Sequence, residues 1–192
     1  MLPDRLLSHL LAAPGVVVHE FAHKLACDLA NVPVIETVYF QFGDPPGYVR
    51  HHQPSAYRTS FLISIAPFFV NTIVALLASF WFWVLLSTLG SLHAPVELLE
   101  GLVAAEPPTQ AGVFVLGWLG LSIGQHAFPS NGDAATLWDR TRAEWRSTPL
   151  VLVGLPFVAL IYLSNLLSWA YADLWYAVGL WTGAFVLVAG VP

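Results

Sequence analysis

The stretch TSFLISIAPFFVNTIVALLASFWFWVLLSTLGSLHAPV, residues 59–96, contains no Asp, Glu, Lys or Arg. A helix that crosses a bilayer needs about 20 mostly apolar residues. The stretch is longer than one straight crossing requires, and Pro67 lies inside it, where a proline kinks or breaks a helix. We therefore expect a membrane segment over about 55–89, either as one long kinked helix or as two pieces that meet near Pro67.

The composition of the whole chain agrees with this expectation. Hydrophobic residues make up 57% of the 192 residues and charged residues only 10%, whereas a soluble domain carries about 25% charged residues. The aromatic residues fit belts at the two membrane interfaces. The formal net charge is −5 and no basic patch is present, which argues against nucleic acid as a partner. The lipid bilayer is the expected surrounding.

Apolar segments on both sides of this stretch predict further membrane helices, at about residues 6–30, 111–128, 149–169 and 174–191. The expected fold is an all-α polytopic membrane protein with about five transmembrane helices. The kink-forming pair Pro14-Gly15 lies in the first segment, which is therefore either one kinked helix or a short helix followed by a span.

The connections between these segments carry their own patterns. VIETVYFQF and YVRHHQP flank GDPPG, and β-branched and aromatic runs around a Gly/Pro turn predict a β-hairpin over 34–50. Residues 131–147 predict a short amphipathic helix. We expect residues 1–147 to form a membrane core, and residues 148–192 to form a C-terminal transmembrane hairpin with a tight turn at Asp173.

The distribution of arginines predicts the sidedness of a multi-pass protein in the cell membrane. Five arginines lie near the hairpin and after the third span (Arg50, Arg58, Arg140, Arg142 and Arg146), and the loop over 90–110 is acidic. Cytoplasmic loops carry the excess of Lys and Arg. We expect the hairpin, the loop after residue 128 and the C-terminus on the cytoplasmic side, and the N-terminus outside.

The sequence HEFAH, residues 19–23, places three ionisable groups inside the first apolar segment. His19 and His23 are four residues apart, so a helix brings both imidazoles to one face. Two such imidazoles can bind one Zn²⁺, and Glu20 can take a proton from the attacking water. Ionisable residues in a span usually mark a functional site. The alternative is a polar cluster that holds helices together by hydrogen bonds.

A catalytic zinc usually has three protein ligands. Asp133 follows Pro129 and Gly132 at the cytoplasmic end of the third span, which makes its carboxylate the candidate third ligand. The alternative role for Asp133 is an N-cap of the next helix. His126 is the rival ligand, and its alternative roles are a group that supports the site and a hydrogen-bonded contact between helices. His51 and His52 lie in a polar stretch and are expected to be solvated.

The order of these motifs resembles the site-2 protease family of intramembrane zinc metalloproteases. HEFAH resembles the HExxH of the family. APFFVN (66–71) resembles its G-P-x-x-N element, with Ala66 in place of Gly, and FPSNGD (128–133) resembles the segment that brings an Asp to zinc. The resemblance covers about residues 10–140. It implies zinc ligands at His19, His23 and Asp133, a general base at Glu20, and structural or site-lining positions at Pro67 and Asn71.

The last motif departs from the family pattern. Gln125 stands where the family has Asn, Pro129 is a single proline, and Ala134 replaces a Gly. The resemblance then implies that Gln125 or His126 takes over the positioning of substrate. We expect a minimal version of the family without a PDZ-like domain.

The expected function is cleavage of a membrane protein or peptide substrate by an intramembrane zinc metalloprotease. The substrate would add as a strand near Val38–Phe42 or Tyr48–Arg50, unless these strands only cover the site. The alternatives are a catalytically inactive zinc-binding module and a metal transporter. Few carboxylates lie in the spans, which disfavours the transporter.

Overall fold

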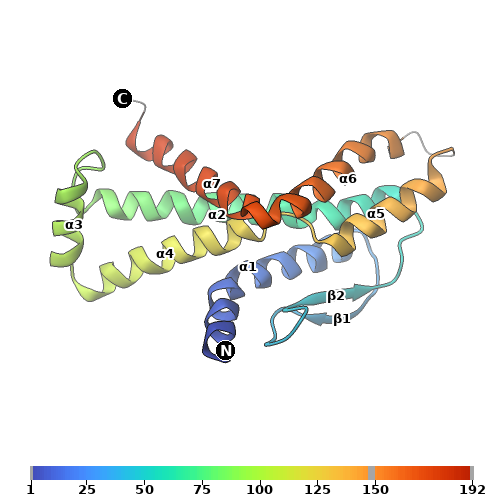
Figure 1. Cartoon of the computed structure of the whole chain (residues 1–192), viewed down its shortest axis with the longest axis horizontal. Coiled ribbons are helices and arrows are strands. Elements are labelled where there is room, and N and C mark those ends of the chain that lie inside the picture. The colour runs from blue at the N-terminus through green and yellow to red at the C-terminus, as the bar shows by residue number, and fades with distance from the viewer. Residues whose placement is uncertain (1, 147–149, 191–192) are drawn as a thin grey trace.

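The structure is a computed structural model that describes residues 2–146 and 150–190. Within these residues the chain is mostly helical, with one small two-stranded sheet (Figure 1). The elements in chain order are α1 (Leu2–Leu29), β1 (Val34–Val38), β2 (Tyr48–His51), α2 (Tyr57–Ser87), α3 (Pro95–Ala104), α4 (Pro107–Gln125), α5 (Asn131–Glu144), α6 (Leu150–Leu166), the 3₁₀ turn η1 (Leu167–Ala170) and α7 (Ala172–Ala189).

Helix α2 is the element around which the others pack. It is one helix of 31 residues with Pro67 inside it, so the long stretch does not break into two pieces. It runs along the long axis of the molecule, and α1, α4, α5 and α7 all contact it (Figure 1). In the part of the chain that the structure describes, α2 and α7 are the helices long and apolar enough to cross a membrane.

The C-terminal part differs from the expected transmembrane hairpin. Helix α6 packs against α5 and α2, whereas α7 packs against α2 and α4. The chain changes direction at Tyr171, which has a left-handed backbone (φ 57°), and not at Asp173. The physical reason is that α6 buries Val158 and Ile161 against Leu137 of α5. The expected helix start at 149 and the expected boundary at 147/148 lie outside the described residues.

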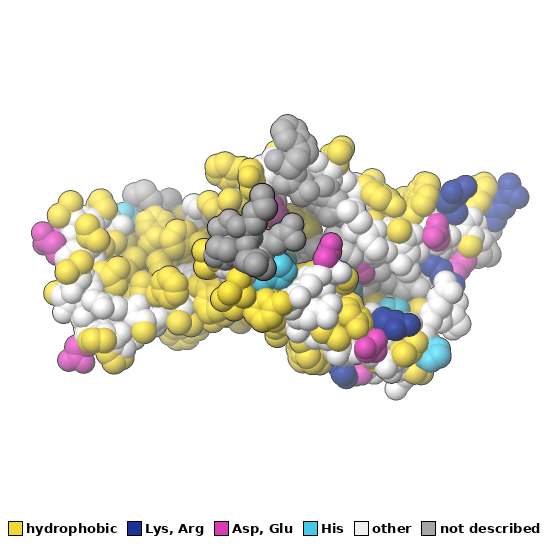
Figure 2. Space-filling view, turned by 60° about the horizontal axis from the view of Figure 1, so that its bottom comes forward, with side chains coloured by type: hydrophobic (Ala, Val, Ile, Leu, Met, Phe, Trp, Pro, Cys, Tyr) yellow, Lys and Arg dark blue, Asp and Glu magenta, His cyan; other side chains and the backbone are white. Residues whose placement is uncertain are grey.

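Three of the predicted connections can be compared with the structure. The predicted β-hairpin is confirmed: β1 and β2 pair antiparallel, with Glu36 opposite Arg50 and Val38 opposite Tyr48. The predicted amphipathic helix is α5. Helix α4 ends at Gln125, before the expected residue 128, and the acidic loop contains the unexpected helix α3. Figure 2 shows the Lys and Arg side chains gathered toward the end of the molecule that holds the hairpin and α5, whereas acidic side chains appear at both ends.

Helix α1 is one kinked helix. Its first part runs across the direction of α2, and the part after Pro14 runs along α2 (Figure 1). A straight helix would join the Leu11 carbonyl to the Gly15 N–H. Here both groups have partners on α4: Trp118 Nε1 donates to the Leu11 oxygen at 2.9 Å, and Gly15 N donates to Ser122 Oγ at 3.1 Å. These two contacts with α4 stabilise the kink. After the kink, the HEFAH segment of α1 runs along α2.

The contact at Gly15 leaves no room for a side chain. A Cβ at this position would overlap the Ser122 carbonyl oxygen and the His126 ring, whereas a Cβ at Gly179 would meet nothing within 4 Å. We expect Gly15→Ala to destabilise the fold by about 1–3 kcal/mol, the usual cost of overpacking. Thermal unfolding in detergent measures the effect, with Gly179→Ala as the matched control. Equal melting temperatures for the two variants would contradict the packing described at the kink.

Candidate metal site

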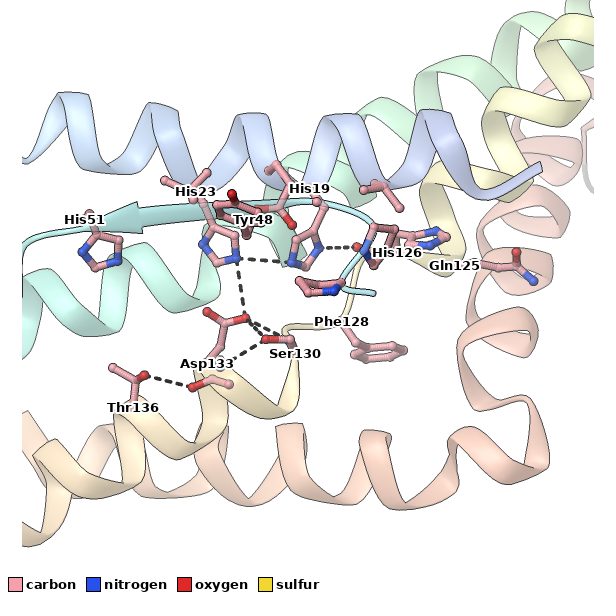
Figure 3. A pocket seen from close by; sticks show the side chains of 17 residues that line it. His19, His23, Tyr48, His51, Gln125, His126, Phe128, Ser130, Asp133 and Thr136 are labelled. Carbon is pink, nitrogen blue, oxygen red and sulfur yellow. Dashed lines mark hydrogen bonds and ion pairs between the residues drawn. The ribbon is translucent and has the colours of Figure 1, made fainter. Parts of the chain in front are cut away.

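The HEFAH motif lies on the part of α1 that faces α2 and the start of α5. His19, Glu20 and His23 are 9%, 9% and 8% exposed. Nε2 of His19 lies 3.2 Å from Nε2 of His23, and Oδ2 of Asp133 lies 3.5 Å from the same His23 nitrogen (Figure 3). One ligand atom from each of the three residues lies within 4.8 Å of the others. The structure thus brings together the three residues that the sequence indicated as ligands.

Backbone carbonyls fix the orientation of both imidazoles. His19 Nδ1 lies 2.8 Å from the His126 carbonyl oxygen, and His23 Nδ1 lies 3.1 Å from the Ile63 carbonyl oxygen. A carbonyl can only accept a hydrogen bond, so each Nδ1 carries the proton and donates it. Both Nε2 atoms then present lone pairs to the same point. Two lone pairs at this distance repel unless a proton or a cation lies between them.

These three groups fit zinc. Zinc binds histidine nitrogen and carboxylate oxygen at about 2.0–2.2 Å in tetrahedral geometry, which places neighbouring ligand atoms roughly 3.3 Å apart. The distances from His23 Nε2 to His19 Nε2 and to Asp133 Oδ2, 3.2 and 3.5 Å, agree with that arrangement, and the ligand atoms of His19 and Asp133 lie within 4.8 Å of each other. Metal-binding histidines also commonly donate their second N–H to a carbonyl, as both do here. The donor set of two nitrogens and one oxygen leaves a fourth position for water.

Asp133 belongs to the candidate metal cluster and also takes part in capping α5. Ser130 is the N-cap of α5, and Asp133 is the third helical residue of a capping box: its Oδ2 accepts from Ser130 N at 2.9 Å. The alternative N-cap role therefore belongs to Ser130. Burial alone would raise the pKa of Asp133, but the positive charge that His23 carries when it is protonated, together with the Ser130 hydroxyl, lowers that pKa to about 2. The carboxylate is ionised at neutral pH, as a metal ligand requires.

His126, the rival ligand, does not bring its ring to the cluster. Its Nδ1 donates to the Ser122 carbonyl at 2.8 Å, and its ring lies against Gly15 at the kink of α1. Only the His126 backbone carbonyl takes part, as the acceptor for His19. Gln125, the other candidate for positioning substrate, has its amide turned away from the three ligands (Figure 3).

Asn71 of α2 connects α1 with the C-terminal end of α4 beside the site. Its Nδ2 has two hydrogens and lies 2.9 Å from the His126 carbonyl oxygen and 3.3 Å from the carbonyl oxygens of Gly15 and Ile123, so one hydrogen is shared between two acceptors. The side chain is fully buried, so these bonds form away from water. Asn71 therefore does not line the cavity, and it holds the carbonyl that orients His19. Pro67 is also buried, one turn before Asn71 on α2.

A cavity of about 540 Å³ opens beside the ligands. Its lining includes the three ligands and Glu20 from the core, and Pro45, Pro46, Gly47, Tyr48 and His51 from the hairpin. Gly47 lies so close to α1 that a Cβ there would be 2.8 Å from Glu20 Cγ. The hairpin thus covers Glu20 through a residue without a side chain.

Sequence reasoning missed part of this site. His51 was expected to be solvated, yet it lines the cavity, and no local pattern marked it. The role of Ser130 could have been found, because Ser130 and Asp133 have the S-x-x-D spacing of a capping box. The Ile63 carbonyl is a backbone group and carries no residue-type pattern.

Comparison of the chain with protein-family profiles, with characterised proteins and with solved structures gave no match.

Proposed function

We propose that this chain is an intramembrane zinc metalloprotease. The observation that supports the proposal is the convergence of His19 Nε2, His23 Nε2 and Asp133 Oδ2, with both imidazoles oriented by backbone carbonyls. Glu20, the residue next to His19, lines the same cavity. This combination is the one that metal-assisted hydrolysis uses.

The chemistry divides between the metal and the chain. Zinc, when bound, supplies Lewis acidity and lowers the pKa of its water to about 7. The Glu20 carboxylate would accept a proton from the attacking water and donate it to the leaving amine. His126 and Ile63 would hold the imidazoles in place through their carbonyls, and the hairpin would keep bulk water away from Glu20.

The proposal includes a multi-pass arrangement in the cell membrane. Helices α2 and α7 support it by their length and apolar composition, and α1, α4 and α6 are the remaining proposed spans. Asp133 lies in the first turn of α5, the helix that also carries Arg140 and Arg142, and Figure 2 shows the Lys and Arg side chains at the end of the molecule that holds α5 and the hairpin. By the positive-inside rule, the site would be near the cytoplasmic face.

The substrate would be a peptide segment of a membrane protein that adds to β2. Tyr48, Val49 and His51 of β2 line the cavity, whereas no residue from 38 to 42 does. Strand β2 pairs with β1 on one side. An extended peptide along its other edge would pass the metal ligands, and main-chain hydrogen bonds would hold it. This favours β2 over the segment Val38–Phe42.

One observation favours a second function, a zinc-binding module without peptidase activity. Gln125 lines the cavity, but its amide is turned away from the three candidate ligands (Figure 3). A binding module would keep the zinc site and lack cleavage.

The two functions are separated by an assay in vesicles. We expect purified protein, reconstituted with fluorescent transmembrane peptides, to release a cleaved fragment that mass spectrometry detects. Fragment formation should stop when a chelator removes zinc and return when zinc is restored. Protein that holds zinc but releases no fragment from any peptide of such a library would support the binding module instead.

A further inference from the structure

Pro67 lies in the interior of α2 and leaves one carbonyl without its helical partner. In an α-helix each N–H donates to the carbonyl four residues earlier, and proline has no N–H. The residue four before Pro67 is Ile63. The Ile63 carbonyl is therefore free to accept a hydrogen bond from outside the helix.

His23 supplies that hydrogen bond. Its Nδ1 lies 3.1 Å from the Ile63 oxygen in a buried contact between α1 and α2. The bond satisfies an acceptor that would cost about 1–3 kcal/mol if it stayed buried and unpaired. It also determines that the His23 proton is on Nδ1, so that the Nε2 lone pair faces His19 and Asp133.

We propose that Pro67 is a positioning residue for the metal site: its missing N–H reserves the Ile63 carbonyl for His23. This inference rests on the proposed zinc site. Asn71, four residues later on the same helix, orients His19 through the His126 carbonyl. Helix α2 thus orients both imidazoles although it contributes no ligand.

The test compares two substitutions that differ by one backbone atom. Pro67→Ala restores the N–H, which then competes with His23 for the Ile63 carbonyl. Pro67→lactic acid, introduced as an α-hydroxy acid, has the same methyl side chain but an ester oxygen in place of the N–H. Both lose the same packing of the proline ring. Pro156→Ala is the control, because Pro156 lies inside α6, away from the site.

The measurements are the zinc dissociation constant and the visible spectrum of the Co²⁺-substituted protein, which reports ligand geometry. We expect Pro67→Ala to weaken zinc binding by about 10- to 100-fold, the usual effect of losing an outer partner of a ligand, and to change the Co²⁺ spectrum. The lactic acid variant and Pro156→Ala should bind zinc like the wild type.

Two results would contradict the proposed role of Pro67 without contradicting the proposed zinc site. One is a Pro67→Ala protein with wild-type zinc affinity and Co²⁺ spectrum. The other is a lactic acid variant as weak as Pro67→Ala, which would assign the effect to lost packing. A wild-type protein that binds no zinc would instead overturn the proposed function, and the inference with it.

Discussion

Replacing Glu20 with Gln is expected to lower peptide cleavage by about 10²- to 10⁴-fold, the usual contribution of a general base, without loss of zinc. Glu20 is only 9% exposed, and glutamine has the same shape, so the packing around residue 20 should be kept. Glutamine cannot accept the proton of the attacking water. Glu20 is not among the three ligand residues, so zinc content should stay at the wild-type value. Fragment release in vesicles and metal analysis of the same preparation measure the two effects.

The matched control for this variant is Asp28→Asn on the same helix. Asp28 forms an exposed ion pair with Lys24, and exposed pairs of this kind contribute little to stability. Cleavage by Asp28→Asn should equal that of the wild type. If Glu20→Gln keeps both its zinc and its full activity, Glu20 is not the base and the proposed mechanism fails.

Replacing Asp133 with Asn is expected to weaken zinc binding strongly. Losing an outer partner of a ligand weakens metal binding by about 10- to 100-fold, and losing a charged ligand should weaken it more than that. The change removes the charged ligand atom 3.5 Å from His23 Nε2. An amide oxygen can still accept from Ser130 N, so the capping box is largely kept. Isothermal titration with zinc gives the affinity.

Ser130→Ala separates the two roles of Asp133. It removes the side-chain cap of α5, which costs about 1 kcal/mol of stability, and leaves the Asp133 carboxylate in place. We expect Ser130→Ala to lower the melting temperature and to weaken zinc binding by about 10- to 100-fold, because Ser130 Oγ donates to Asp133 Oδ2 at 2.6 Å as an outer partner of that ligand. The loss should stay smaller than that of Asp133→Asn. Equal losses of zinc affinity in the two variants would mean that Asp133 acts only through the cap.

Two of the three candidate metal ligands could be predicted from the sequence because their arrangement is local. His19 and His23 are one helical turn apart, so a helix alone brings them together. The hairpin could be predicted because GDPPG separates two strand-forming runs. The approach of Asp133 to His23 is not local, because it depends on how α4 and α5 pack against α1.

The groups that orient the ligands could not be predicted, because they depend on contacts between helices. The Ile63 and His126 carbonyls reach the imidazoles only in the observed alignment of α1, α2 and α4. The packing of α6 on α5 was missed for a related reason. The short loop near Asp173 favours a hairpin locally, but the buried contacts of Val158 and Ile161 with Leu137 hold α6 elsewhere.

The central claim is that His19, His23 and Asp133 hold one zinc ion, and X-ray absorption at the zinc edge tests it most directly. The protein would be purified in detergent and its metal content measured first. We predict about one zinc per chain, with nitrogen and oxygen neighbours at about 2.0–2.2 Å, imidazole scattering, and no sulfur at about 2.3 Å. A chain that holds no zinc, or one that keeps its zinc when both His19 and His23 are replaced by Ala, would contradict the account.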